Sequence, residues 1–375
     1  MKKIGYLLFA VIFNICKLFP VKIGKNILFN GHNHGLNGNL LQIKKGLMKA
    51  EASVEIKWYA KKDMFSGGGL GKIKGIFGFF ILLPFQMATA EIIFLNDNFL
   101  PLAYCYPSKR TKIVQLWHGA GAFKKFGLST ETDERVKQQV ERANSRLTHL
   151  FVTSEKVIPF YQEAFGIKKD RIYVTGIPVT DVYFEQDRKE QAQERFYKIY
   201  PELHEKRLLL YTPTFRRTSR ENLEIMEHFP MERLQELLGD SWVVLVKMHP
   251  KYPVSNIPRH SFCYDMTNYA HITDLYFVSD LLVTDYSSTV VEYVLLDKPV
   301  ILYAYDLEEY DRGFYREYES SVPGEIAQNE EELLALLSGL GENSTRRQAF
   351  ADMQYDYKDN GATERILSVL KRGCI

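Results

Sequence analysis

The sequence contains few cysteines, and their spacing excludes the common cysteine-based sites. Its 375 residues include four of them, Cys16, Cys105, Cys263 and Cys374, which lie far apart and form no CxxC pair. This spacing predicts neither a zinc site nor a disulfide framework. It is typical of a protein that works in a reducing compartment.

Several motifs of known enzymes and nucleic-acid-binding proteins are also absent from the sequence. We find no GxGxxG fingerprint, P-loop, serine-hydrolase elbow or aspartate-rich metal site. RNP, zinc-finger and helix-turn-helix signatures are absent as well, so no nucleic-acid partner is expected. With 46% hydrophobic and 25% charged residues, the composition is that of a globular protein. The length predicts about two domains.

Arginine is missing from the N-terminal region, whose positive charge comes from lysine alone. Residues 1–80 contain 13 lysines and 3 acidic residues, a net charge of +10. Since the whole chain carries +2, the other residues carry −8. Such an asymmetry predicts a basic face for an anionic partner, either a nucleic acid or a membrane surface.

Two apolar segments in this region favour the membrane. In residues 1–19, the 13 uncharged residues between Lys3 and Lys17 are fewer than the roughly 20 that span a bilayer. No A-x-A-like cleavage site follows, as a signal peptide would require. The second segment, 75–90, contains Pro84, which disfavours a straight spanning helix. A buried crossover helix is the alternative for both. We expect peripheral, monotopic attachment to an anionic membrane surface, at the cytoplasmic face of the cell membrane.

Short apolar strands alternate with helical patterns along most of the chain. The predicted strands are 26–30, 54–59, 91–95, 112–117, 149–154 and 171–176, and then 208–212, 242–248, 280–285 and 299–305. Several lack period-two alternation, as strands buried on both faces do, and the intervening helices imply parallel sheets with right-handed crossovers. We therefore predict an α/β protein with two Rossmann-type, doubly wound lobes and a cleft between them.

A highly charged segment, 185–207, separates the two strand series and is predicted to be a linker helix. The expected organisation is a membrane-associating segment at 1–19, an N-terminal Rossmann-like acceptor and membrane domain at 20–184, and a C-terminal Rossmann-like nucleotide-binding domain at 208–375. In such folds, ligands bind at the carboxyl ends of the strands. The polar motifs of this sequence follow the predicted strands.

A hydroxyl cluster follows a strand of the second series, in VTDYSSTVVEY (283–293). Ser287, Ser288 and Thr289 stand where an apolar helix begins, and the unpaired N–H groups of a helix start favour an anion. The alternative is simple N-capping, which needs one such residue. Glu292, one turn further on, is a candidate acceptor for a ribose hydroxyl or else a solvated helix residue.

Two more strands of the second series lead into basic stretches, VKMHPKY (246–252) and YTPTFRRTSR (211–220). Phosphate binding is favoured, because arginine grips phosphate in bidentate fashion and lysine neutralises it. A solvated basic loop or a structural histidine is the alternative. The candidate residues are Lys247, His249, Lys251, Thr212, Thr214, Arg216 and Arg217.

In the first strand series, QLWHGAGAFKKFG (115–127) places a histidine at a strand end. His118 is followed by Gly119, Ala120 and Gly121, which leave room for a phosphate or an acceptor hydroxyl. Histidine titrates near neutral pH and is suited to take a proton from such a hydroxyl.

A glycine-rich stretch, NGHNHGLNGN (30–39), follows the first predicted strand. His32 and His34 suggest a metal site, but no nearby Cys, Asp or Glu completes a set of ligands. A turn that contacts the substrate is the better interpretation.

Taken together, these residues resemble the CDP-glycerol glycerophosphotransferase family of teichoic acid biosynthesis. The matching segments are ATAEIIFLNDN (88–98), QLWHGAGAFKKFG, YTPTFR, KMHP, TDYSSTVVEY, LDKPVILYAYD (296–306) and DRGFY (311–315). The chain resembles a short, primase-like member, because polymerising members typically carry a further N-terminal region.

This resemblance implies a GT-B-like pair of lobes and a reaction. Glycerol phosphate would move from CDP-glycerol to a hydroxyl of an undecaprenyl-diphosphate-linked saccharide acceptor, with release of CMP. By motif match, His118 would be the general base, His249 a catalytic residue on the phosphate side, and Ser287 and Ser288 ligands of the diphosphate. Arg312 of DRGFY joins the predicted substrate-binding residues.

Other interpretations of the same residues remain open. A related transferase that uses CDP-ribitol or a nucleotide sugar would share these features. A non-catalytic, membrane-bound partner of a wall-polymer complex is disfavoured, because a scaffold does not need polar motifs at strand ends. No cofactor is expected to be required, since lysine and arginine can neutralise phosphate charge. Asp285 is expected to cap a helix, with a divalent metal ion as the alternative. The oligomeric state stays open.

Overall fold

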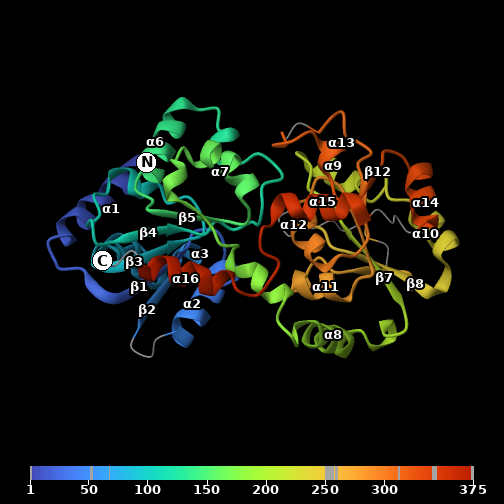
Figure 1. The fold of residues 1–375 in the computed structure, drawn as a ribbon, viewed down its shortest axis with the longest axis horizontal. Coiled ribbons are helices and arrows are strands. Elements are labelled where there is room, and N and C mark those ends of the chain that lie inside the picture. The colour runs from blue at the N-terminus through green and yellow to red at the C-terminus, as the bar shows by residue number, and fades with distance from the viewer. Residues whose placement is uncertain are drawn as a thin grey trace. The chain divides into compact units, whose positions relative to one another are not determined.

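The protein contains two six-stranded parallel β-sheets, described here from a computed structural model (Figure 1). The structure describes residues 2–50, 54–66, 68–249, 257, 261–310, 313–339 and 344–372. Two compact units are present: unit 1 comprises Met1–Asp181 and Tyr355–Ile375, and unit 2 comprises Val182–Gln354. Each unit holds one sheet with helices packed on it, which confirms the predicted α/β fold with two Rossmann-like lobes.

Unit 1 has the strand order β2-β1-β3-β4-β5-β6. Its strands are β1 (Lys22–Asn30), β2 (Glu55–Ala60), β3 (Ala90–Leu95), β4 (Lys112–Gln115), β5 (His149–Val152) and β6 (Ile172–Val174). Its α-helices are α1 (Lys2–Cys16), α2 (Gly38–Ala50), α3 (Lys61–Phe65), α4 (Leu70–Phe77), α5 (Leu83–Ala88), α6 (Glu134–Asn144), α7 (Ile158–Phe165) and α16 (Ala362–Arg372). Consecutive residues of β1, such as Ile27 and Leu28, are both fully buried, which explains why the strand lacks alternation.

Unit 2 has the strand order β12-β11-β10-β7-β8-β9. Its strands are β7 (Arg207–Thr212), β8 (Trp242–Val246), β9 (Cys263–Asp265), β10 (Leu281–Thr284), β11 (Val300–Tyr303) and β12 (Glu325–Ala327). Its α-helices are α8 (Arg188–Ile199), α9 (Ser219–Glu224), α10 (Met231–Leu238), α11 (Ile272–Val278), α12 (Thr289–Tyr293), α13 (Tyr318–Ser321), α14 (Glu330–Ser338) and α15 (Ser344–Gln354). The sequence did not predict β9 and β12, because neither lies in a longer apolar run of the kind that indicated β6, which also has three residues.

The units differ from the predicted domain division in two places. Helix α8, predicted to be a linker, packs on α11 inside unit 2, where Arg188 and Arg195 approach the buried Asp274 carboxylate at 3.0 and 2.7 Å. The C-terminal segment from Tyr355 onward, predicted to belong to the second domain, is part of unit 1. Periodicity did not reveal this return, because an apolar stripe does not specify which sheet it covers.

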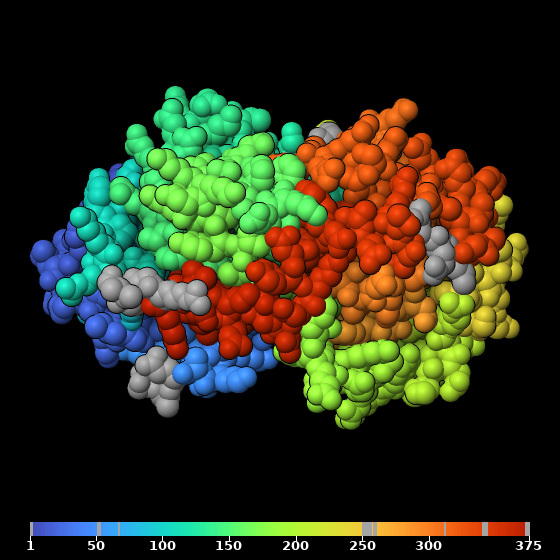
Figure 2. Space-filling view, viewed as in Figure 1, coloured from blue at the N-terminus to red at the C-terminus, as the bar shows by residue number. Residues whose placement is uncertain are grey.

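Helix α16 packs beside α2 on the unit 1 sheet. Ile366 and Leu367 belong to the same buried cluster as Leu40 of α2. Gly46 of α2 permits the close approach, since a Cβ there would lie 2.5 Å from a methyl carbon of Thr363. Figure 2 shows the C-terminal segment, in red, on the surface of unit 1. The apolar side of the last helix is therefore part of the unit 1 core, and its other side is exposed.

Helix α1 and the helical stretch Leu70–Ala88, which we call the apolar helices, expose side chains that soluble proteins usually bury. In α1, Phe9 and Phe13 point into the core, yet Ile4 is 70% and Val11 53% exposed. The stretch Leu70–Ala88 has 19 residues and is, among the described residues, the one helix long and apolar enough to cross a membrane by length and composition. The other exposed apolar residues here are Leu7, Leu8, Ile15, Leu70, Ile73, Ile76, Phe77, Ile81, Leu82 and Phe85.

Pro84, which the sequence indicates to disfavour a straight spanning helix, lies inside this stretch without ending it. It occupies the first turn of α5, directly after a π-helical turn at Gly78–Leu82. A π-helical turn relieves the clash between a proline ring and the carbonyl group of the preceding turn. The helix therefore continues through the proline.

We predict that Ile366→Ala lowers the free energy of unfolding by about 2–5 kcal/mol, because it leaves a cavity between α16 and the sheet. Ser368→Ala, at an exposed position of the same helix, should change it by less than about 0.5 kcal/mol. Denaturant titration of both variants measures the difference. Equal stabilities would show that α16 is not part of the cooperative core.

Candidate functional site

His118 lies on the loop after β4, at the carboxyl edge of the unit 1 sheet. The residue before it, Trp117, has a φ of 57°, a left-handed conformation that is rare for a bulky side chain. Gly119 follows, and a Cβ at that position would meet no atom within 4 Å. Open space therefore adjoins the loop at Gly119, directly after His118.

Side-chain amides hold Trp117 in its unusual conformation. Gln115 Oε1 accepts a hydrogen bond from the Trp117 N–H at 2.9 Å, and Asn39 Nδ2 donates to the Trp117 carbonyl at 3.0 Å. Asn39 Oδ1 in turn accepts from the N–H of Val179 at 2.8 Å. The indole packs edge to face on Phe165, with ring centroids 5.2 Å apart. Backbone strain of this kind persists only where its surroundings determine it, and it is concentrated at functional sites.

The imidazole of His118 is oriented by the backbone of the neighbouring loop. Its Nδ1 lies 3.2 Å from the carbonyl oxygen of Asn96, which follows β3. Since a carbonyl oxygen only accepts, we assign the hydrogen to Nδ1, which leaves Nε2 as a proton acceptor. Desolvation lowers the pKa of His118, and the neighbouring His32 lowers it further. The Asp97 carboxylate and the hydrogen bond to Asn96 raise this pKa but do not outweigh desolvation. A histidine with a lowered pKa is neutral near pH 7 and can serve as a base.

The two histidines of the glycine-rich loop after β1 have different partners. The ring of His32 stacks on that of His118, with centroids 4.8 Å and planes 10° apart. His34 Nδ1 instead lies 2.6 Å from the carboxylate of Asp63 in α3. Within the described ranges, no group of three or more His, Cys, Asp or Glu side chains could hold a metal ion. His32, and not His34, is thus the histidine of this loop that contacts His118.

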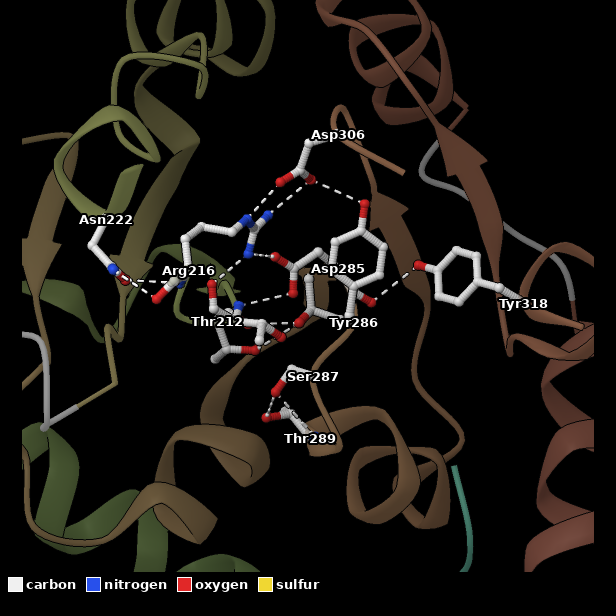
Figure 3. A network of polar contacts seen from close by, with 11 residues as sticks. Thr212, Arg216, Asn222, Asp285, Tyr286, Ser287, Thr289, Asp306 and Tyr318 are labelled. Carbon is white, nitrogen blue, oxygen red and sulfur yellow. Dashed lines mark hydrogen bonds and ion pairs between the residues drawn. The ribbon is translucent and has the colours of Figure 1, made fainter. Parts of the chain in front are cut away.

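In unit 2, the predicted hydroxyl cluster follows β10 (Figure 3). Ser287 Oγ lies 2.8 Å from Thr289 Oγ1 and accepts from the Thr289 N–H at 3.3 Å. Ser288 is exposed, and its side chain does not cap α12, which spans five residues. The hydroxyl groups of Ser287 and Thr289 therefore lie together at the carboxyl edge of this sheet, and Ser288 is open to solvent.

Arg216 is the centre of a buried ion-pair network, also drawn in Figure 3. Its Nε and Nη2 donate to the carboxylate of Asp306 at 2.6 and 3.0 Å, and its Nη1 lies 2.9 Å from Asp285 Oδ2. Tyr286 donates to Asp306 at 3.0 Å, and the Tyr318 hydroxyl donates to the Asp285 carbonyl at 3.1 Å. The guanidinium is 8% exposed and already paired with two carboxylates. We therefore assign Arg216 a structural role, in place of the predicted phosphate contact.

Asp285 is part of the same network. The sequence predicted that it caps a helix, but it does not cap α12. Its Oδ1 accepts from the N–H of Thr214 at 2.8 Å, and its Oδ2 pairs with Arg216. Both carboxylate oxygens thus tie the loop after β10 to the loop after β7. Asp285 therefore stabilises the arrangement of these two loops at the carboxyl edge of the sheet. A buried carboxylate requires hydrogen-bond donors, and the N–H of Thr214 and the guanidinium of Arg216 supply them.

Lys247 is likewise held by the protein itself. Its ammonium group donates to the carbonyl oxygens of Met266, Thr267 and Tyr269 at 3.0, 2.9 and 2.8 Å. An ammonium group has three protons, so these bonds use all of its donors. Burial lowers the pKa of Lys247, which is the direction expected for a desolvated amine. These bonds give Lys247 a structural role, and its contact with a phosphate stays a prediction.

Thr212 and Thr214 are buried, whereas His249, also predicted to contact the phosphate, is exposed. Thr212 is 3% exposed, and its carbonyl accepts from the Thr284 hydroxyl at 2.6 Å, so it joins two strands of the sheet. Thr214 is 6% exposed, and its hydroxyl has no hydrogen-bond partner among the described residues. His249 is exposed, with its ring 4.8 Å from that of Phe215 in the loop after β7. Of these three residues, His249 is the one that a ligand could reach directly.

Glu292 is held inside unit 2 and is not a solvated helix residue. It accepts a hydrogen bond from the Tyr183 hydroxyl at 2.6 Å. Burial raises the pKa of Glu292, and the bond from Tyr183 opposes that shift. Its contact with a ribose hydroxyl stays a prediction. Lys251 and Arg312 lie outside the described residues.

Sequence reasoning missed several residues of both edges. Asn39, Asn96 and Asp97 surround the His118 loop, and Asp306 and Tyr318 complete the Arg216 network. A signal was present for Asn96, Asp97 and Asp306, since each comes directly after an apolar strand in a segment already noted, FLNDN or LYAYD. Asn39 and Tyr318 lie on helices and carried no such signal.

Comparisons with known proteins agree on one family. The family model described as CDP-Glycerol:Poly(glycerophosphate) glycerophosphotransferase matches residues 12–371. The teichoic acid poly(ribitol-phosphate) polymerase of Bacillus spizizenii is 30% identical over 98% of this chain, which spans 59% of the length of that protein. The teichoic acid glycerol-phosphate primase of Bacillus subtilis is 30% identical over 76% of this chain and 75% of its own. The solved structure of the wall teichoic acid polymerase TagF has a TM-score of 0.78 at 20% identity, covering 98% of this chain and 93% of the other. At that identity, the likeness to TagF concerns the fold.

We predict that Arg216→Lys destabilises the protein by about 3–5 kcal/mol, because one ammonium group cannot satisfy two buried carboxylates that a guanidinium bridged. Arg217→Lys, the same change at the exposed neighbouring position, should alter stability by less than about 0.5 kcal/mol. Unfolding by denaturant measures both. A stable Arg216→Lys protein with reduced affinity for pyrophosphate would contradict the structural assignment.

Proposed function

Because this chain belongs to the CDP-glycerol:poly(glycerophosphate) glycerophosphotransferase family, we propose that it transfers an alditol phosphate from a CDP-alditol to an acceptor hydroxyl in teichoic acid synthesis. The family match over residues 12–371 is the observation that supports this most, since it includes both strand edges. At one edge His118 offers a base, and at the other the hydroxyls of 287–289 offer phosphate ligands.

In the proposed reaction, the acceptor oxygen attacks the β-phosphorus of the donor while Nε2 of His118 takes the proton of the attacking hydroxyl. A new P–O bond forms, the bond from the β-phosphorus to the bridging oxygen breaks, and CMP leaves with that electron pair. Such a transfer depends on positioning and charge neutralisation. We assign contacts with the diphosphate to Ser287, Ser288 and the exposed His249.

Glycerol phosphate is the transferred group that we propose first, and ribitol phosphate is the second candidate. The family description and the name of the Bacillus subtilis primase specify glycerol phosphate. The Bacillus spizizenii polymerase is named for ribitol phosphate. An assay that offers both donors separates the two candidates.

We propose further that the acceptor is a saccharide on undecaprenyl diphosphate, and that the protein binds the cytoplasmic face of the membrane through the apolar helices. The outer side of α1 supports this, since Ile4 and Val11 are more than half exposed where a soluble helix carries polar groups. Lysines flank both apolar helices, and cationic flanks favour an anionic lipid surface. A lipid-linked acceptor would then be concentrated beside the enzyme.

For the reaction, we predict that the protein releases CMP from CDP-glycerol in the presence of a lipid-linked acceptor, whose mass increases by one or more glycerol phosphate units. His118→Ala should lower kcat/KM by about 10²–10⁴-fold, the range of a lost general base, with the fold preserved by circular dichroism. His204→Ala, an exposed histidine paired with Glu205, is the control and should keep wild-type activity. Product from CDP-ribitol alone would replace glycerol by ribitol, and full activity of His118→Ala would remove the proposed base.

For the membrane, we predict that the protein sediments with vesicles rich in phosphatidylglycerol. Replacing Leu8, Val11 and Ile15 by serine should weaken this binding at least about tenfold, since burying each apolar side chain contributes about 1.5–3 kcal/mol. The control replaces Ile199, Leu223 and Leu237 by serine, which are also exposed apolar residues but lie in unit 2. An equal loss of binding in both variants would refute the assignment of the apolar helices.

A further inference from the structure

Two loops meet at His118 and are tied together by a pair of amides. Asn30, at the end of β1, accepts a hydrogen bond through its Oδ1 from Asn96 Nδ2 at 3.0 Å. Asn96 Oδ1 accepts from the N–H of Gly31 at 3.1 Å, and Asn30 Oδ1 accepts from the N–H of His32 at 3.1 Å. Both asparagines are buried. The backbone of His32 therefore has a set position relative to Asn96, whose carbonyl accepts from the His118 ring.

The side chains of these loops place a second histidine and a carboxylate beside His118. The His32 ring lies parallel to the His118 ring at 4.8 Å. Asp97 Oδ2 lies 3.8 Å from His32 Nδ1. Gly31 permits this arrangement, because a Cβ at its position would lie 3.1 Å from Cβ of Asp97. In the described part of the chain, Asp97 and His32 are the titratable groups that act on the His118 ring.

We propose that Asp97 and His32 are positioning residues that set the proton affinity of His118 in opposite directions. This inference rests on the proposed role of His118 as the base. During transfer, the His118 ring gains a proton and becomes a cation. The Asp97 carboxylate stabilises that cation and makes His118 a stronger base, whereas a proton on His32 makes it a weaker one.

The same arrangement couples the two histidines to pH. When His32 takes up a proton, it pairs with Asp97 and places a positive charge one stacking distance from His118. Both changes remove support from the protonated His118, since like charges disfavour each other and the carboxylate is engaged elsewhere. A charge on His32 and the carboxylate of Asp97 therefore act in opposite directions on the protonated His118 ring.

The test is the pH dependence of kcat/KM, whose acidic limb reports the pKa of the base in the free enzyme. Asp97→Asn removes a group that raises the pKa of His118, so the limb should move to lower pH by about 1 unit. His32→Gln removes a group that lowers this pKa, so the limb should move to higher pH by a similar amount. The matched control is His34→Gln, the same change on the same loop at a histidine paired with Asp63, and its limb should stay in place.

A structural role for these residues would not give shifts of opposite sign. Loss of activity with an unmoved limb in both variants, or movement of both limbs in one direction, would overturn the proposal. Circular dichroism and denaturant unfolding confirm that each variant is folded before its profile is interpreted.

A second measurement separates this inference from the proposed function. Histidine ring resonances of the full-length protein are titrated by NMR without substrate, with the His118 signal identified by its loss in His118→Ala. The signal should titrate at lower pH in Asp97→Asn and at higher pH in His32→Gln than in the wild type. An unchanged titration refutes the inference. Shifted titrations together with full transfer by His118→Ala would refute the role of His118 as base and leave the coupling of the three side chains intact.

Discussion

The parallel pairing of the strands is the constraint on which both candidate edges depend. Strands covered by helices on both faces cannot hold unpaired polar side chains, so the polar residues of this chain collect where the strands end. Neighbouring strands then decide which loops meet. In unit 1 the adjacent strands β1, β3 and β4 bring His32, Asp97 and His118 together, and in unit 2 the adjacent strands β11, β10 and β7 bring Asp306, Asp285 and Arg216 together.

In unit 2, the buried Arg216 and the partly buried Lys247 and Lys298 stabilise the shape of the loops. Arg216 pairs with two carboxylates, and Lys247 and Lys298 each donate to three carbonyl oxygens. Removing one partner of a buried charge is costly, which makes these contacts rigid. Their rigidity holds the loops in place, while Ser288 and His249 are exposed. At the carboxyl edge of the unit 1 sheet the notable feature is backbone strain and not a charge network. Trp117 is held in a left-handed conformation directly before His118.

Much of the fold could be read from the sequence, and the limits of that reading have physical causes. Ten of the described strands were predicted from apolar runs and are present, whereas β9 and β12 lie outside any such run and were not predicted. The hydroxyl cluster and His118 were identified because strand ends carry the functional residues of such folds. For Lys247 and Arg216 the sequence predicts phosphate contacts and the structure shows protein partners, because a cation in a sequence looks the same whether its partner is a carbonyl, a carboxylate or a phosphate. Helix α16 was placed with the wrong sheet for a similar reason, since its apolar stripe fits either one.

The sequence by itself determined the α/β class, the family resemblance, the lysine-rich apolar segments and the residue types available at the strand ends. These follow from local patterns, which any short window of the chain contains. Only the tertiary structure decided which cations are already neutralised, that Glu292 is held by Tyr183, and that His32 rather than His34 stacks on His118. Each of these depends on contacts between residues far apart in the chain, because the order of strands in a sheet, and not their order in the sequence, brings the partners together.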